Sequence, residues 1–200
     1  MMAHVRRSTL VGIATVLMLF MVTGCGASPS GASTQSTSTA TGHDQGPSGD
    51  IPDTATFLTY RSTHYTLQYV EGWVQQGLAN DGVQFTDKDS FVRVILQPPS
   101  SSATQYAAVS GMAQTAREFP QLTGAKVTSV ALPAGNAALI AFQTQSVPDP
   151  VTSKTVSLTV DRYYIPGPHF MAVLTQATPL GVDNVDAFLQ IAKSFGWSGQ

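Results

Sequence analysis

The sequence predicts an α+β domain: a mainly antiparallel β-sheet of about six to eight strands, flanked by two or more helices. Three observations support this fold class. Short segments between residues 57 and 176 alternate apolar and polar residues, which is the period of a strand. Turn-rich stretches join these segments as hairpins. Two longer segments instead place apolar residues at helical spacing. Hairpin-linked strands with helices packed on them define this class.

The strands follow one another along most of the domain. We expect them at 57–61, 64–70, 83–86, 91–97, 125–131, 137–146, 155–165 and 169–176. In the second of these, Tyr65, Leu67 and Tyr69 share one face. Pro98 and Pro99 end the strand before them, because proline cannot donate to the hydrogen-bond ladder. The last strand is apolar on both faces, which predicts a central position in the sheet.

The first expected helix covers 102–119. Ser102 and Gln105 have the spacing of a capping box, and Pro120 follows the last residue. We expect its buried face to consist of Tyr106, Val109, Met112, Ala116 and Phe119.

The second helix closes the domain. Asp183 or Asn184 is expected to cap it, and Gly196 follows its end, as is typical of a helix C-terminus. The expected buried face consists of Val185, Phe188, Leu189, Ala192 and Phe195.

The N-terminus has the features of an exported lipoprotein. Residues 1–24 read as a signal peptide, with Arg6 and Arg7 before an apolar segment of 13 residues at 10–22. That segment is shorter than the ~20 residues needed to span a bilayer. Residues 22–25, Val-Thr-Gly-Cys, resemble the bacterial lipobox. The resemblance implies cleavage before Cys25 and a lipid on its thiol. An ordinary signal peptide or an uncleaved anchor with a chance cysteine is the alternative.

Residues 25–53 are expected to form the lipidated cysteine and a tether, and residues 54–200 a single domain. The stretch 26–49 is rich in Ser, Thr and Gly and has no aromatic residue, and no aliphatic one larger than Ala. Such a segment cannot bury enough apolar surface to offset the entropy of ordering it. The sequence therefore predicts a domain held to the extracytoplasmic face of a membrane by a disordered linker.

Composition narrows the range of functions. Only 11% of the residues are charged, well below the roughly 25% usual for soluble domains. The net charge is −2, and without Arg6 and Arg7 eight basic residues stand against twelve acidic ones. A nucleic-acid binder would instead show a basic face. The single cysteine cannot form a disulfide within the chain.

The motifs of common catalytic and cofactor sites are missing from the sequence. It has no Gly-x-Ser-x-Gly elbow for a serine hydrolase and no phosphate-binding glycine loop. His64 and His169 are the only histidines of the domain, and their separation gives no ligand spacing for zinc. Asp87 and Asp89 lack the remainder of a calcium loop. We therefore expect no catalytic residues, metal or cofactor.

Two arginines are the candidate binding residues. Arg93 shares a strand face with Phe91 and Ile95, and Arg162 continues the apolar face of its own strand. An arginine on an apolar face must reach water or find an acceptor. A salt bridge or a strand end is one interpretation. The other is a pocket in which Arg93 and Arg162 hold a small anionic ligand.

Residues 69–73, Tyr-Val-Glu-Gly-Trp, resemble the "YPxGW" element of the PsbP superfamily, with Val70 in the place of the usual proline. The segments 149–154, 161–164 and 183–186 are similar to uncharacterised bacterial lipoproteins of this superfamily. The resemblance covers most of residues 55–198. It implies an antiparallel sheet between helices and a non-catalytic accessory or binding role.

The expected function is therefore that of a membrane-anchored extracytoplasmic lipoprotein, acting as a non-catalytic accessory or binding module. Its expected partners are the membrane, through the lipid, and either an envelope protein or a small anionic ligand, with no nucleic acid. A lipoprotein hydrolase acting on envelope material, or a purely structural envelope component, remains the alternative.

Overall fold

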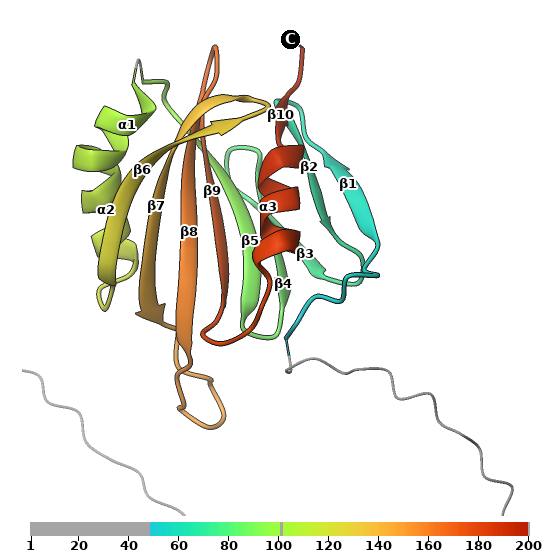
Figure 1. Cartoon of the computed structure of the whole chain (residues 1–200). Coiled ribbons are helices and arrows are strands. Elements are labelled where there is room, and N and C mark those ends of the chain that lie inside the picture. Colours follow the sequence, from blue (N-terminus) through green and yellow to red (C-terminus); the bar gives the residue numbers. More distant parts are fainter. Residues whose placement is uncertain (1–48, 101, 200) are drawn as a thin grey trace, which may run out of the picture. The chain divides into compact units, whose positions relative to one another are not determined.

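The computed structural model describes residues 49–100 and 102–199. These residues form ten strands and the helices α1, α2 and α3, together with one π-helical turn, η1 (Figure 1). The strands make two sheets in which every pairing is antiparallel. The α+β class with a mainly antiparallel sheet is confirmed.

The larger sheet has seven strands in the order β3-β4-β5-β9-β8-β7-β6. Their bounds are β3 Val74–Leu78, β4 Gly82–Asp87, β5 Ser90–Gln97, β6 Thr123–Leu132, β7 Gly135–Gln145, β8 Ser157–Pro166 and β9 Met171–Pro179. The strand expected at the centre is indeed central: β9 lies between β5 and β8, and residues 171–178 are all buried.

The smaller sheet was not anticipated. It consists of β1 (Phe57–Arg61), β2 (Tyr65–Val70) and the two-residue β10 (Gly196–Trp197). The alternation in β2 is confirmed, because Tyr65 and Leu67 are buried. The expected list lacked both β10 and β3, since β10 has only two residues and β3 is a largely exposed edge strand.

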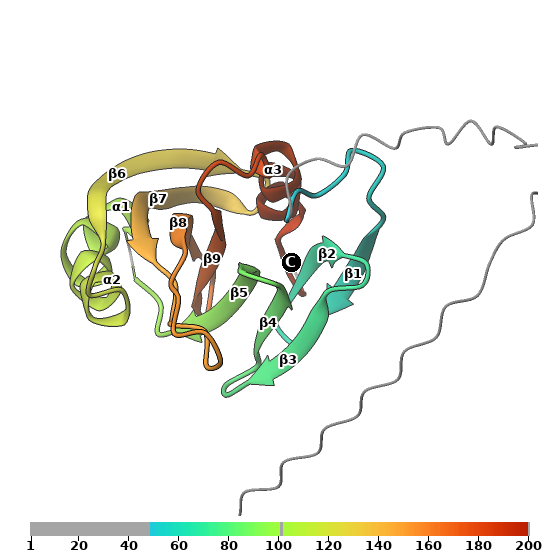
Figure 2. The same ribbon diagram turned by 90° about the horizontal axis from the view of Figure 1, so that it is seen from below.

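The seven-stranded sheet has two differently covered faces (Figures 1 and 2). The face that packs against α3 (Val185–Ser194) and the smaller sheet is here named the closed face; its core includes Phe85, Val94, Leu174 and Phe188. The opposite face is here named the open face. It is covered by α1 (Ala103–Tyr106), η1 (Ala107–Gly111) and α2 (Met112–Glu118).

The expected face of the first helical segment is confirmed in part, because Tyr106, Met112 and Phe119 are half-buried against the open-face core. The fully buried stripe is a different one: Ala103, Ala107, Gly111 and Thr115, four positions apart. Val109, expected in the core, is 70% exposed. The π turn inserts into the helix and shifts its phase. Small residues are needed on this stripe, because a Cβ on Gly111 would lie 2.8 Å from Cζ of Tyr164.

The expected face of the last helix is confirmed at Phe188, Ala192 and Phe195, which are buried. Ile191 joins them, whereas Val185 is 69% exposed and Leu189 is also exposed. Asn184 occupies the N-cap position, but its side chain makes no cap hydrogen bond.

Instead, the Asn184 side chain forms hydrogen bonds with the backbone at the N-terminal end of the described residues. Its Oδ1 accepts from the backbone N–H of Ile51 at 2.8 Å, and its Nδ2 donates to the carbonyl oxygen of Gly49 at 3.1 Å. Ile51 is buried in the closed-face core. The folded unit thus reaches back beyond Thr54. Residues 1–24 and Cys25, with the tether up to residue 48, lie outside the described residues.

Among the described residues, no helix has both the length and the apolar character required to cross a membrane.

Candidate functional site

The structure brings Arg93 and Arg162 together on the open face. β5 and β8 flank β9, and both arginines are in register with the same residue of β9, Thr175. The three side chains therefore form one row across the centre of the sheet and point to the same side. The sequence placed each arginine on an apolar strand face but gave no sign that the two lie in one row.

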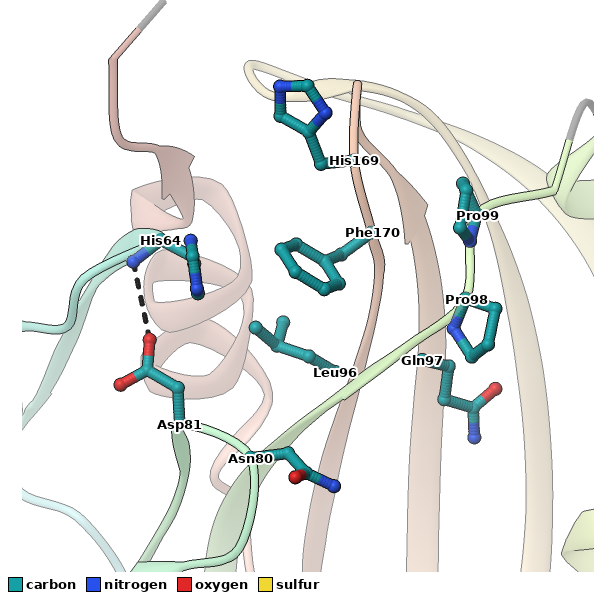
Figure 3. Close-up of a pocket in the computed structure, with 9 residues that line it drawn as sticks. All are labelled: His64, Asn80, Asp81, Leu96, Gln97, Pro98, Pro99, His169 and Phe170. Atoms are coloured by element: carbon teal, nitrogen blue, oxygen red, sulfur yellow. Dashed lines mark hydrogen bonds between the residues drawn. The ribbon is translucent and has the colours of Figure 1, made fainter.

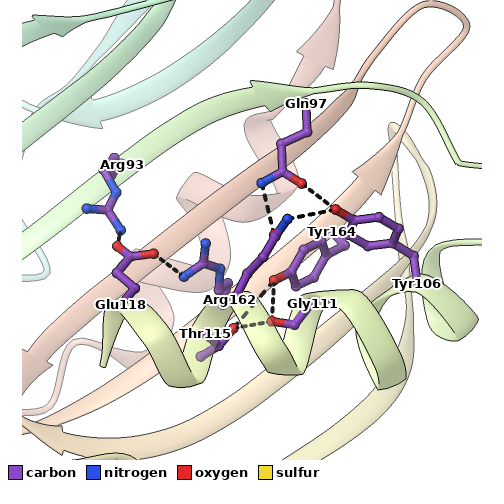
Figure 4. Close-up of polar contacts among 9 residues, drawn as sticks. Arg93, Gln97, Tyr106, Gly111, Thr115, Glu118, Arg162 and Tyr164 are labelled. Carbon is purple, nitrogen blue, oxygen red and sulfur yellow. Dashed lines mark hydrogen bonds and ion pairs between the residues drawn. The ribbon is translucent and has the colours of Figure 1, made fainter. Parts of the chain in front are cut away.

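Glu118, the last residue of α2, bridges the two arginines (Figure 4). Its Oε2 accepts from Nη1 of Arg162 at 2.6 Å, and its Oε1 forms an ion pair with Nη2 of Arg93. Burial raises the pKa of Glu118, but the charges and hydrogen bonds of Arg162 and Arg93 outweigh it, so the pKa lies below the usual value. The carboxylate is therefore charged at neutral pH, and the three groups carry one net positive charge.

The two arginines have different surroundings. Arg162 is only 1% exposed, and its Nε has no hydrogen-bond partner among the described residues. Arg93 is partly exposed and lies 5.5 Å from the centre of the Phe91 ring. Arg162 thus holds Glu118 through a buried ion pair, whereas Arg93 is the arginine that a ligand in solution can reach.

Arg93 lines a cleft of about 590 Å³ on the open face, here named the arginine cleft. The cleft lies between β4 and β5, the segment that follows α2, and the β7–β8 loop. Its walls include Phe91, Phe119, Pro148 and Leu158. This volume is within the range of about 300–1,000 Å³ found for small-molecule sites.

Polar groups in the arginine cleft can orient a ligand. Glu118 and Asp89 are its acidic lining residues. Thr144 also lines it; this residue is 4% exposed, and its hydroxyl has no hydrogen-bond partner among the described residues. A buried hydroxyl without a partner costs free energy. A ligand group that hydrogen-bonds to this hydroxyl would recover that cost.

A hydrogen-bond network fixes the helical segment on the sheet and so positions Glu118 (Figure 4). Tyr106 donates to Gln97, Gln97 to Gln114, and Gln114 back to Tyr106, at 2.9, 3.1 and 3.0 Å. The hydroxyls of Thr115 and Tyr164 both donate to the backbone carbonyl oxygen of Gly111. The carboxylate is therefore held in place before any ligand arrives.

Glu118 was not among the residues singled out from the sequence. A signal was present, because Glu118 is the only acidic residue in 102–119 and stands close to the helix end. What the sequence did not show is that this end of the helix lies over the row formed by Arg93 and Arg162.

The two histidines line one pocket, although about a hundred residues separate them in the chain. His64 and His169 line a second pocket, which does not include the arginines. No set of three or more His, Cys, Asp or Glu side chains suited to a metal ion occurs within residues 49–100 and 102–199.

Comparisons with known proteins complete this description. No family model matches the chain, and no curated protein matches it. Its fold is similar to the solution structure of cyanobacterial PsbP (CyanoP) from Synechocystis sp. PCC 6803, with a TM-score of 0.49 and 15% sequence identity. The match covers 76% of this chain and 99% of that one.

Proposed function

We propose that this protein is a lipid-anchored, extracytoplasmic binding module without catalytic activity, and that the arginine cleft takes a small molecule carrying an anionic group. The observation that carries the proposal is Arg93 in the cleft. It is a partly exposed cation, and the cleft that it lines also holds a buried hydroxyl, that of Thr144, with no partner among the described residues. Apolar walls around a few polar groups are typical of ligand sites.

The charge balance supports an anion. Arg93 and Arg162 share one carboxylate, so Glu118 neutralises only one of the two cations. An anionic group at Arg93 would balance the second. Guanidinium groups bind carboxylate and phosphate groups through two parallel hydrogen bonds. Asp89 lines the same cleft and would oppose a ligand with several negative charges, which favours a single anionic group.

The anchor rests on the N-terminal sequence. An apolar segment too short to span a bilayer precedes the lipobox-like Val-Thr-Gly-Cys, and a linker rich in Ser, Thr and Gly follows. Lipid on Cys25 would hold the domain at a membrane surface. The PsbP resemblance of residues 69–73 agrees with a non-catalytic role.

Thermal unfolding of the full chain tests the ligand class. A compound bound only by the folded state must raise the melting temperature as its concentration increases. We would compare monocarboxylates, phosphate monoesters, neutral sugars and divalent cations. A shift from the anions alone supports the proposal. A shift from sugars or cations alone contradicts it. The absence of any shift would also contradict it and would point to an envelope protein partner, to be sought by cross-linking in cells.

The anchor needs a separate test. Cells producing the chain would be fed a labelled fatty acid, beside cells producing Cys25→Ala. We expect label on the parent protein only, with the variant lost from the membrane fraction. Equal labelling of both proteins, or a parent protein without label, would contradict lipidation of Cys25.

A further inference from the structure

A second pocket lies away from the arginine cleft, where β5 ends and β9 begins (Figure 3). We name it the histidine pocket. It has a volume of about 570 Å³, and four separate segments form its walls. The lining includes His64, Asp81, Leu96, Pro98, Pro99, His169 and Phe170.

Hydrogen bonds fix the side of the pocket that carries His64. The hydroxyl of Ser62 donates to Oδ2 of Asp81 at 2.7 Å and accepts from the backbone N–H of His64 at 3.1 Å. The N–H of Tyr65 also donates to Ser62, and the Tyr65 hydroxyl donates to the carbonyl oxygen of Asp81. The turn that carries His64 is therefore tied to the β3–β4 turn.

The opposite side is fixed by Trp197. Its indole Nε1 donates to the carbonyl oxygen of Pro166 at 3.1 Å, and its ring lies against Gly167, which leaves no room for a Cβ. The turn between β8 and β9 is thereby held so that Phe170 points into the pocket (Figure 3). Since both sides are held by contacts within the domain, the pocket is preformed.

The chemistry of the lining is distinctive. Phe170, Leu96 and the two prolines form apolar walls, and the His64 and Phe170 rings are 4.7 Å apart. Neither imidazole has a hydrogen-bond partner among the described residues. Every imidazole carries at least one N–H donor, whatever its protonation state. The pocket thus offers apolar walls with one imidazole donor, that of His64, beside Phe170, and a second, that of the exposed His169, at the rim (Figure 3).

The one carboxylate of the pocket does not cancel these donors. Oδ2 of Asp81 already accepts from Ser62 and from the backbone of His64. In Figure 3 its second oxygen points away from Leu96 and Phe170. The negative charge is engaged in fixing the turn and is not directed at the interior.

We infer that the histidine pocket binds a compact aromatic carboxylate. Its ring would contact Phe170 and Leu96, and its carboxylate would accept from the imidazole of His64, with the exposed His169 as a second donor at the rim. The inference is independent of the arginine cleft, because the two sites share no residue.

The test uses two probes with the same ring system and similar size, naphthoate and the neutral naphthylmethanol, titrated into the full chain and followed by NMR. The informative variant is His64→Phe/His169→Phe, which retains both rings but removes their N–H donors. Val151→Phe serves as the control, because it adds an exposed ring in the β7–β8 loop, where Val151 is 89% exposed. The melting temperature of each variant reports whether its fold is intact.

We expect naphthoate to shift the signals of Leu96 and Phe170 and to bind at least about ten-fold more tightly than naphthylmethanol. The double variant should lose that preference, and Val151→Phe should retain it. Equal affinity for the two probes would overturn the carboxylate assignment. Undiminished naphthoate affinity, read from the Leu96 and Phe170 signals of the folded double variant, would overturn the role of the imidazoles; signals shifted only around Arg93 would report the arginine cleft instead. Unmoved signals of Leu96 and Phe170 at millimolar naphthoate would overturn the site itself.

Discussion

The two faces of the seven-stranded sheet are built in different ways. On the closed face, α3 and the smaller sheet cover an apolar core in which Phe85, Leu174 and Phe195 are buried. On the open face, the helical segment presents mainly small residues, and a charged row of Arg93, Glu118 and Arg162 crosses the sheet. A cleft remains beside that row.

This difference indicates which face stabilises the fold and which is available for binding. Apolar burial is the main favourable contribution to folding, and the closed face contains most of it. Buried ion pairs contribute little net stability, because removing charges from water costs about as much as their attraction returns. The charged row of the open face therefore has a small net effect on folding.

The largest effect is expected on the closed face. Leu174→Ala in β9 removes a fully buried side chain and leaves a cavity, which should lower the free energy of unfolding by about 3 kcal/mol. Chemical denaturation measures the loss. Ligand binding in the arginine cleft should be unchanged as long as the variant is folded. A loss below about 1 kcal/mol would show that the closed face is not the main source of stability.

A somewhat smaller effect is expected from Glu118→Gln. This change leaves Arg162 buried without a counter-charge, and we expect it to lower the free energy of unfolding by about 2 kcal/mol, since the carboxylate is partly exposed. Glu118→Gln/Arg162→Met removes both charges and should recover most of the loss. If the double variant were less stable than the single one, the charged row would contribute net stability.

Acid should reduce the contribution of the Glu118 ion pairs to the unfolding free energy. The pKa of Glu118 in the folded protein is lower than its ordinary value of 4.5. The ion pairs thus contribute fully above about pH 4.5, and their contribution is lost as the pH falls through the lower folded pKa. The unfolding free energy of the parent protein should fall more steeply with acid than that of Glu118→Gln. Parallel curves for the two proteins would contradict this.

Asp161, on the closed face of β8, should have the opposite effect on how the unfolding free energy depends on pH. Burial raises its pKa above the ordinary value of 3.8. The folded state therefore holds the proton more tightly than the unfolded state, and stability falls as the pH rises through that range. Asp161→Asn should be more stable than the parent protein at pH 7 and closer to it at pH 3 when unfolding is measured at both. A less stable variant at pH 7 would contradict this small effect.

The sequence predicted the closed face better than the open one. Strand alternation in β2 and the doubly apolar β9 follow from local periodicity, and both were confirmed. The π turn changed the buried stripe of the first helical segment, because periodicity assumes a regular helix. The smaller sheet depends on β10, whose two residues are too few to form a pattern.

The sequence identified the two arginines of the candidate site but not Glu118. The in-phase positions of Arg93 and Arg162 identified both arginines, and the salt bridge was one of the two interpretations considered. Their shared register with Thr175 and the carboxylate between them depend on the order of the strands in the sheet. Residues far apart in the chain meet only through that order, which local patterns do not contain. The shared pocket of His64 and His169 has the same origin.

Calorimetric titration of the parent chain and Arg93→Gln, with the anion that raises the melting temperature most, tests the central claim most directly. Arg93 is partly exposed, so its loss should change the unfolding free energy by less than about 1 kcal/mol. The affinity for the anion should fall at least about ten-fold, because a charge-assisted hydrogen bond is lost. Equal affinity of the two folded proteins would contradict the assignment of the open face as the binding face.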